Sequence, residues 1–121
     1  MRKYKIGIIG FGTVGSGIYK ILTSKLDSHP ILKEIEISKI AVKDLNKKRD
    51  IELDNNLLTD DPFKLINDPS IDVIVEVMGG VDLAKDIILQ SLILGKSVVT
   101  ANKAVIARYG EEIYKLSLIH I

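Results

Sequence analysis

The chain has 121 residues, contains no cysteine and carries a formal net charge of +1. This length suits one domain, and the small net charge gives no field that would favour nucleic acid or a membrane surface. The absence of cysteine excludes disulfides, thiolate zinc sites and cysteine nucleophiles, and it fits a reducing, cytoplasmic compartment. No run approaches the roughly 18 apolar residues of a membrane span, and the basic start is not followed by a signal-peptide core. We therefore expect a cytoplasmic protein without a nucleic-acid or membrane partner, and we assign no metal ligands.

Strands and helices are predicted to alternate along the chain. Short β-branched runs predict strands, and longer runs with apolar residues three and four apart predict helices. The predicted strands are Tyr4–Ile9, 35–43, 57–59, Ile71–Met78 and Ser97–Thr100. The predicted helices are Thr13 to about Lys25, Pro62–Asn67, Val81–Leu94 and a helix from Lys103 onwards. Because several strands are apolar throughout, we predict an α/β fold of the Rossmann type, a doubly wound and mostly parallel sheet with helices on both faces.

The ends of these helices carry recognisable signals. Asp27–Pro30 should end the first helix, Asp60 or Asp61 should cap the second, and Gly95 should follow the third. Asn102 is a candidate N-cap for the last helix. In the first helix, one apolar face is predicted from the spacing of Val14, Ile18, Ile21 and Leu22.

A glycine motif, G-x-G-x-x-G, joins the first predicted strand to the first predicted helix. Gly10 would permit a tight turn, Gly12 would let the backbone approach a pyrophosphate, and Gly15 would let the helix pack closely on the strand. The helix N-terminus would offer free N–H groups to phosphate. The setting of strand, turn and helix favours a dinucleotide site over a plain turn with a small-residue packing contact.

The end of the second strand bears on which dinucleotide binds. A carboxylate there would bind the ribose 2′-OH of NAD, whereas a cation would accommodate the 2′-phosphate of NADP. Lys43 precedes Asp44, and Lys47, Lys48 and Arg49 follow. The pattern favours NADP, with NAD tolerated, and an ordinary charged loop is the alternative interpretation.

Two further segments follow predicted strands at the edge that lines the ligand crevice in open α/β sheets. Gly79 and Gly80 would allow close approach to ribose or nicotinamide, or would form a simple turn. Glu76 lies within an apolar strand and needs a partner if it is buried, either facing the crevice or at the sheet edge.

Lys103, in the segment T-A-N-K, would begin a helix, where a cation opposes the helix dipole. That field favours the neutral amine, which would help the side chain to exchange protons. The alternative is a surface lysine that tolerates the cost.

Four segments, in order and spacing, resemble the N-terminal half of homoserine dehydrogenase: GIIGFGTVGSGI, AVKDLNKKR, IDVIVEVMGGVDLAK and GKSVVTANKAVIARYG. The resemblance runs from about Lys5 to Lys115, and its most specific part is VVTANKA following EVMGG. This family reduces aspartate 4-semialdehyde to homoserine with NADH or NADPH, reversibly, on the way to threonine, methionine and isoleucine. Leu83 stands where many members have proline.

The resemblance implies a set of cofactor-binding residues in the glycine loop and at the later strand ends. The set is Gly10, Phe11, Gly12, Thr13, Val14, Gly15, Lys43, Gly79, Gly80, Thr100, Asn102 and Lys103. Within it, the glycine-loop residues would hold the pyrophosphate, Lys43 would lie near the adenosine ribose, and the Gly79–Gly80 pair would flank the nicotinamide. Lys103 is the catalytic candidate, through contact with substrate and cofactor or through proton transfer.

The resemblance also implies that residues 1–115 are an NAD(P)-binding domain and that a substrate domain, with a second catalytic lysine, lies beyond the chain. The full-length enzyme would be a homodimer or homotetramer, and this chain alone would not turn over. Residues 116–121, LSLIHI, break the helical pattern and match the translation of CTGTCTCTTATACACATC, a common transposase-end sequencing adapter. We expect a non-native tail there and give His120 no functional weight.

Two rival functions share these features. One is a nucleotide-sensing Rossmann module without catalysis, which would not need the T-A-N-K lysine. The other is a different semialdehyde or amino-acid dehydrogenase of the same fold.

Overall fold

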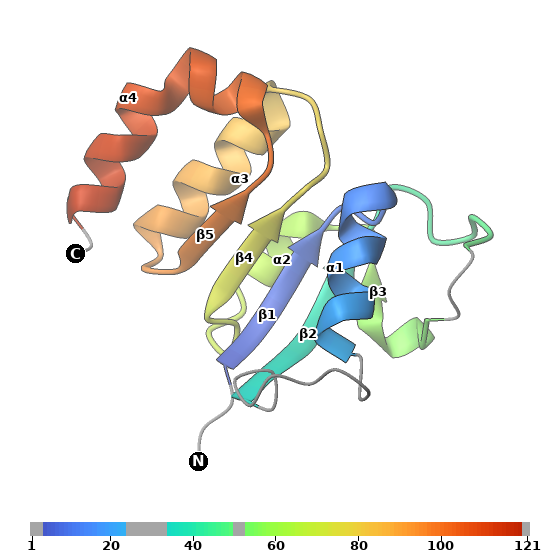
Figure 1. The fold of residues 1–121 in the computed structure, drawn as a ribbon. Coiled ribbons are helices and arrows are strands. Elements are labelled where there is room, and N and C mark those ends of the chain that lie inside the picture. Colours follow the sequence, from blue (N-terminus) through green and yellow to red (C-terminus); the bar gives the residue numbers. More distant parts are fainter. Residues whose placement is uncertain (1–3, 24–33, 50–52, 120–121) are drawn as a thin grey trace.

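A computed structural model of the chain describes residues 4–23, 34–49 and 53–119 (Figure 1). Within these ranges five strands form one sheet in the order β3-β2-β1-β4-β5, and each neighbouring pair runs parallel. The strands are β1 (Tyr4–Ile9), β2 (Ile35–Ala41), β3 (Leu58–Thr59), β4 (Val73–Glu76) and β5 (Ser97–Thr100). The predicted parallel sheet is confirmed, although β4 is shorter than the apolar run from Ile71 to Met78 suggested.

Helices cover both faces of this sheet, as the Rossmann-type pattern predicts. The helical elements are α1 (Thr13–Thr23), the short 3₁₀ helix η2 (Asn55–Leu57), α2 (Pro62–Ile66), α3 (Asp82–Ile93) and α4 (Lys103–Ile119). Figure 1 shows α1 on one face and α2 with α3 on the other, while α4 lies beside α3 at the β5 end of the sheet. The 3₁₀ helix was not predicted from the sequence, which placed Leu57 at the start of a strand.

The core consists of layers on the two sides of the sheet, because successive strand residues point to opposite faces. Ile8 belongs to the cluster that packs under Tyr19 and Leu22 of α1. Its neighbour Ile9 belongs to the cluster that includes Leu65 of α2 and Ile87 of α3. This arrangement explains why β1 carries isoleucine at two successive positions, Ile8 and Ile9.

The apolar face predicted for α1 is only partly buried. Ile18 and Leu22 pack against the core, but Val14 is 52% exposed and Ile21 is 64% exposed. Tyr19 takes part in the packing instead and meets Phe11 edge to face, with ring centroids 5.7 Å apart. The predicted end of this helix at Asp27–Pro30 lies outside the described residues.

The caps are where the sequence placed them. Asp61, not Asp60, caps α2 and accepts a hydrogen bond from the backbone N–H of Phe63 at 3.0 Å. Asn102 caps α4 through its Oδ1, which accepts from the N–H of Val105 at 3.1 Å. Gly95 follows α3 with φ of +79°, the left-handed conformation that glycine adopts most readily.

The last helix continues beyond the point where the sequence suggested a break. α4 extends to Ile119, so the prediction that the helical pattern fails at Leu116 is wrong for the described residues. The physical reason is that Leu116 packs against the cluster between α3 and α4, which contains Ala84 and Val105. A local departure from helical geometry occurs earlier, at Tyr109, where φ is −124°.

Candidate cofactor-binding site

The three glycines of the motif have different structural environments. Gly10 adopts a φ of +104°, and a Cβ there would lie 2.8 Å from the Cα of Met78. A Cβ on Gly15 would lie 2.3 Å from the carbonyl oxygen of Gly10, so this glycine allows α1 to pack on the loop. Gly12 has no atom within 4 Å of the position a Cβ would take. Gly10 and Gly15 thus shape the turn, and Gly12 leaves its outer side open to a ligand.

The start of α1 is suited to an anion. The first backbone bond into the helix runs from the N–H of Ser16 to the carbonyl of Gly12 at 2.9 Å, so the N–H groups before Ser16 have no partner within the helix. The first turn of α1, all of which the structure describes, contains no acidic residue. Unpaired N–H groups and the positive end of the helix dipole together favour a phosphate at this position.

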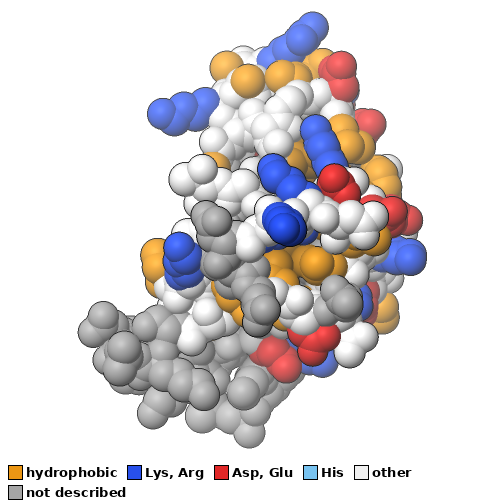
Figure 2. Space-filling model, turned by 90° about the vertical axis from the view of Figure 1, so that its right-hand side faces the viewer, with side chains coloured by type: hydrophobic (Ala, Val, Ile, Leu, Met, Phe, Trp, Pro, Cys, Tyr) orange, Lys and Arg blue, Asp and Glu red, His pale blue; other side chains and the backbone are white. Residues whose placement is uncertain are grey.

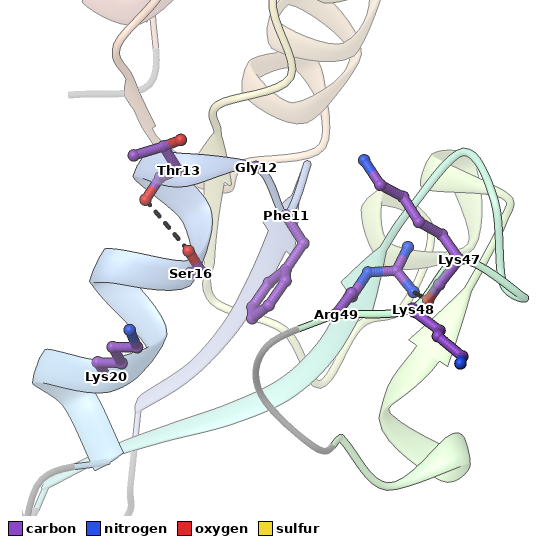
Figure 3. Close-up of a pocket in the computed structure, with 8 residues that line it drawn as sticks. All are labelled: Phe11, Gly12, Thr13, Ser16, Lys20, Lys47, Lys48 and Arg49. Carbon is purple, nitrogen blue, oxygen red and sulfur yellow. Dashed lines mark hydrogen bonds between the residues drawn. The ribbon is translucent and has the colours of Figure 1, made fainter.

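A hollow of about 220 Å³ lies beside this helix end (Figure 3). We call it the basic hollow; its lining residues are Phe11, Gly12, Thr13, Ser16, Lys20, Lys47, Lys48 and Arg49. Four of them are cationic, and none of these described lining residues carries a carboxylate. Figure 2, which views the side that carries the β2–β3 loop, shows Lys and Arg side chains near the middle of that face.

The β2–β3 loop holds its own shape through Arg49. The guanidinium donates to the carbonyl of Asp44 at 2.6 Å and to the carbonyl of Lys47 at 3.0 Å. The carboxylate of Asp44 accepts from the N–H of Asn46 at 2.9 Å. In the view of Figure 3, Lys47 extends from the loop toward the turn at Gly12. Arg49 therefore serves the loop, whereas Lys47 is directed at the hollow.

A second hollow, of about 380 Å³, continues from the first toward the end of β2. It shares Phe11, Gly12, Lys47 and Arg49 with the basic hollow. Its remaining lining residues are Gly10, Val42, Lys43, Asp44, Val77 and Met78. The two hollows form one trough that runs from the start of α1 to the exposed side chains of Lys43 and Asp44.

Hydrogen bonds join the carboxyl ends of β4 and β5 around Glu76, which is 0% exposed. Its Oε1 accepts from the hydroxyl of Thr100 at 2.7 Å, and its Oε2 accepts from the N–H of Met78 at 3.0 Å. The side-chain amide of Asn102 donates to the carbonyl of Gly80. Because β4 lies between β1 and β5, the alternative that placed Glu76 at the sheet edge is wrong.

The structure gathers the predicted site residues into two groups and leaves others outside both. Gly10, Phe11, Gly12, Thr13 and Lys43 line the trough. Gly80, Thr100 and Asn102 belong to the hydrogen-bonded group around Glu76, and none of them lines either part of the trough among the described residues.

The remaining four predicted residues line neither part of the trough and make none of the hydrogen bonds around Glu76 that are described above. Val14 is exposed on α1, and Gly15 is the buried residue of α1 that packs against the loop at Gly10. Gly79 has a φ of +78° with open space around it. Lys103 is exposed at the first position of α4.

Two residues of the basic hollow, Ser16 and Lys20, were not singled out from the sequence. Their spacing of four residues places them on one face of α1, and that spacing was the available signal. The described residues contain no group of three or more side chains that could hold a metal ion. Within the same described ranges, no helix is long and apolar enough to cross a membrane.

Comparison with known proteins gives one consistent family. Residues 10–118 match the family model described as homoserine dehydrogenase, NAD binding domain. A homoserine dehydrogenase of Synechocystis is 47% identical over 116 residues, covering 96% of this chain and 27% of that protein. The homoserine dehydrogenase of Bacillus subtilis is 42% identical, covering 93% of this chain and 27% of that protein.

Solved structures agree with these relatives. The crystal structure of homoserine dehydrogenase from S. aureus at pH 7.0 superposes with a TM-score of 0.88 at 36% identity, over 99% of this chain and 31% of that one. The homoserine dehydrogenase from Thiobacillus denitrificans gives 0.85 at 36% identity, over 99% of this chain and 28% of that one. The chain spans about a quarter of the length of the curated relatives, with 27% of the first two covered. Fold, glycine cradle and sequence therefore agree that this chain belongs to the homoserine dehydrogenase family and contains its domain for a nicotinamide cofactor.

Proposed function

We propose that this chain is the cofactor-binding part of an enzyme that reversibly reduces L-aspartate 4-semialdehyde to L-homoserine with NADPH. The observation that carries the proposal is the cradle at Gly12, where open space, a helix start without acidic residues and a cationic hollow coincide. Together these features suit a diphosphate.

In this proposal the predicted residues hold the cofactor along the carboxyl edge of the sheet. Gly12 and Thr13 would bind the pyrophosphate with backbone N–H groups, Gly10, whose own N–H donates to the carbonyl of Ala41, would shape the turn beneath it, and Lys43 would lie near the adenosine ribose. Gly79 and Gly80, together with Thr100 and Asn102, would border the nicotinamide. When bound, the cofactor supplies the hydride that reduces the aldehyde carbon.

NADP is the proposed preference over NAD. The 2′-phosphate adds negative charge, and the trough offers Lys43, Lys47 and Lys48 near the end of β2. Asp44, the carboxylate that would favour NAD, accepts a hydrogen bond from Asn46 within its own loop. That bond reduces its availability to a ribose 2′-OH.

Lys103 is the proposed catalytic residue contributed by this chain. Its position at the start of α4, next to the N-cap Asn102, presents an amine at the same sheet edge as the Gly79–Gly80 turn. There it would contact substrate and cofactor, and it would donate a proton to the oxygen of the reduced carbonyl.

The remaining parts of the proposal concern the whole enzyme. A substrate domain outside this chain would complete the active site, and the complete protein would act in the cytoplasm as a homodimer or homotetramer. This chain mixed with NADPH and aspartate 4-semialdehyde should therefore show no oxidation of NADPH. Turnover at rates typical of a complete enzyme would contradict that expectation.

Titration of the chain with NADPH and NADH, followed by nicotinamide fluorescence, tests cofactor binding directly. Replacing both Lys47 and Lys48 by glutamine should weaken NADPH binding about tenfold and NADH binding by less, about threefold, because both dinucleotides lose cations near the diphosphate and only NADPH also loses partners for its 2′-phosphate. The matched control is the double change Lys64→Gln and Lys115→Gln, which removes the same charge at exposed positions outside the trough. Failure of the unmodified chain to bind either dinucleotide would contradict the proposal.

A chain extended to the length of its relatives separates an enzyme from a nucleotide sensor. Lys103→Ala in that protein should abolish turnover and leave the affinity for NADPH within about threefold. Unchanged turnover would favour the sensor, and faster turnover of another semialdehyde would favour a different dehydrogenase.

A further inference from the structure

Glu76 is the last residue of β4 and is completely buried, at 0% exposure. It lies opposite Thr100 in the register of β4 and β5. Burying a carboxylate costs free energy unless hydrogen bonds compensate. Here each oxygen accepts one bond, from the hydroxyl of Thr100 at 2.7 Å and from the N–H of Met78 at 3.0 Å.

The hydrogen bonds around Glu76 have a fixed direction. The hydroxyl of Thr100 has one proton, which it gives to Glu76, so its oxygen remains an acceptor for the N–H of Asn102 at 3.0 Å. Asn102 in turn caps α4 through Val105 and donates to the carbonyl of Gly80. One carboxylate thereby orders the turn after β4, the end of β5 and the start of α4.

The position requires a group that only accepts hydrogen bonds. A glutamine would present its oxygen to one of the two donors and its NH₂ to the other, so one N–H or O–H would face another donor. An apolar side chain would leave both the Met78 N–H and the Thr100 hydroxyl without an acceptor, at a cost for each buried group. A carboxylate, with two acceptor oxygens, satisfies both donors at once.

We propose that Glu76 is the positioning residue for the nicotinamide end of the cofactor site. It touches neither cofactor nor substrate; it holds Gly80, Thr100 and Asn102 in the arrangement that receives the nicotinamide and from which Lys103 projects. This inference rests on the proposed function. Glu76 was not among the cofactor-binding residues predicted from the sequence. The inference gives it the role of placing three residues that were: Gly80, Thr100 and Asn102.

The test compares two ligands that differ only in the nicotinamide, the part of the cofactor whose binding site Glu76 is proposed to position. NADPH carries nicotinamide on its second ribose, and 2′-phospho-ADP-ribose shares the adenosine, the diphosphate and that ribose but lacks the nicotinamide. In the chain with Glu76→Gln, NADPH binding should weaken about tenfold, while binding of 2′-phospho-ADP-ribose should change less than about twofold. Glu111→Gln makes the same chemical change at an exposed site on α4 and should alter neither affinity.

Each outcome distinguishes this inference from the proposed function. If the unmodified chain binds neither ligand, the proposed function fails. If it binds both and Glu76→Gln weakens both equally or neither, the cradle stands and the positioning role is overturned.

A second pair of variants serves if circular dichroism shows that Glu76→Gln does not fold. Thr100→Val removes the hydroxyl that links Glu76 to Asn102, and Thr100→Ser keeps it. The inference expects Thr100→Ser to bind NADPH about fivefold more tightly than Thr100→Val, with equal affinities for 2′-phospho-ADP-ribose. Equal NADPH affinities of these two variants would overturn it.

Discussion

The glycine cradle after β1 and the group around Glu76 after β4 lie at the same edge of one sheet, yet they are built by opposite means. The cradle depends on missing side chains: a Cβ on Gly15 would lie 2.3 Å from the carbonyl of Gly10. The group after β4 depends on particular side chains, since Glu76, Thr100 and Asn102 hold one another through hydrogen bonds. The cradle should therefore fail when atoms are added, and the Glu76 group should fail when a donor or acceptor is removed.

The largest expected effect comes from adding one carbon to the cradle. Gly15→Ala should lower the free energy of unfolding by about 3 kcal/mol, because the new methyl meets backbone that cannot move away without displacing β1. Urea unfolding followed by circular dichroism measures this loss.

Gly17→Ala is the matched control for that change. Gly17 lies in the same helix, and its Cβ position has nothing within 4 Å, so alanine should raise the free energy of unfolding by about 0.5–1 kcal/mol. Equal effects of the two alanines would show that close packing at Gly15 does not shape the cradle.

Removing the cap of α4 tests the other region. Asn102→Ala loses the bonds to Val105 and Gly80 and should cost about 1–2 kcal/mol in thermal or urea unfolding. Asn102→Asp keeps an acceptor for the Val105 N–H but cannot donate to Gly80, so it should cost about 0.5 kcal/mol or less. If both variants lost the same stability, the contact with Gly80 rather than the cap would dominate.

The smallest change in stability is expected at the opposite edge of the sheet. This edge serves as a reference for the glycine cradle and for the group around Glu76. Hydrogen bonds from the hydroxyl and the N–H of Ser70 hold the pKa of Asp68 below its ordinary value of 3.8. The stabilisation from this depressed pKa is present above the ordinary value and is lost as the pH falls through the lower, folded-state pKa.

Asp68→Asn should therefore reduce the loss of stability on acidification below about pH 4, by a small amount because solvent screens the partly exposed carboxylate. Unfolding measured between about pH 5 and 2 checks the slope. A steeper slope in the variant than in the unmodified chain would be the wrong sign for this assignment.

Local signals in the sequence predicted most of the fold. β1 and β5 begin and end at the predicted residues, and Asn102 caps α4 as expected. These features depend on residues close together in the chain, so propensity and spacing suffice to identify them. The apolar face of α1 was less well predicted, because whether Ile21 is covered depends on elements distant in sequence.

For the candidate site, the glycine motif alone indicated a turn that could accept a phosphate, because the spacing of Gly10, Gly12 and Gly15 specifies backbone geometry directly. The tertiary structure determines which side chains lie beside that turn. Lys20 from α1 and Lys47 from the β2–β3 loop line the same hollow only because the parallel sheet places α1 beside the end of β2. Glu76 became interpretable only when the register of β4 and β5 put Thr100 opposite it. Short sequence motifs specify local backbone geometry directly. The partner of the buried Glu76 carboxylate is instead set by strand pairing, which brings it to a residue 24 positions later in the chain.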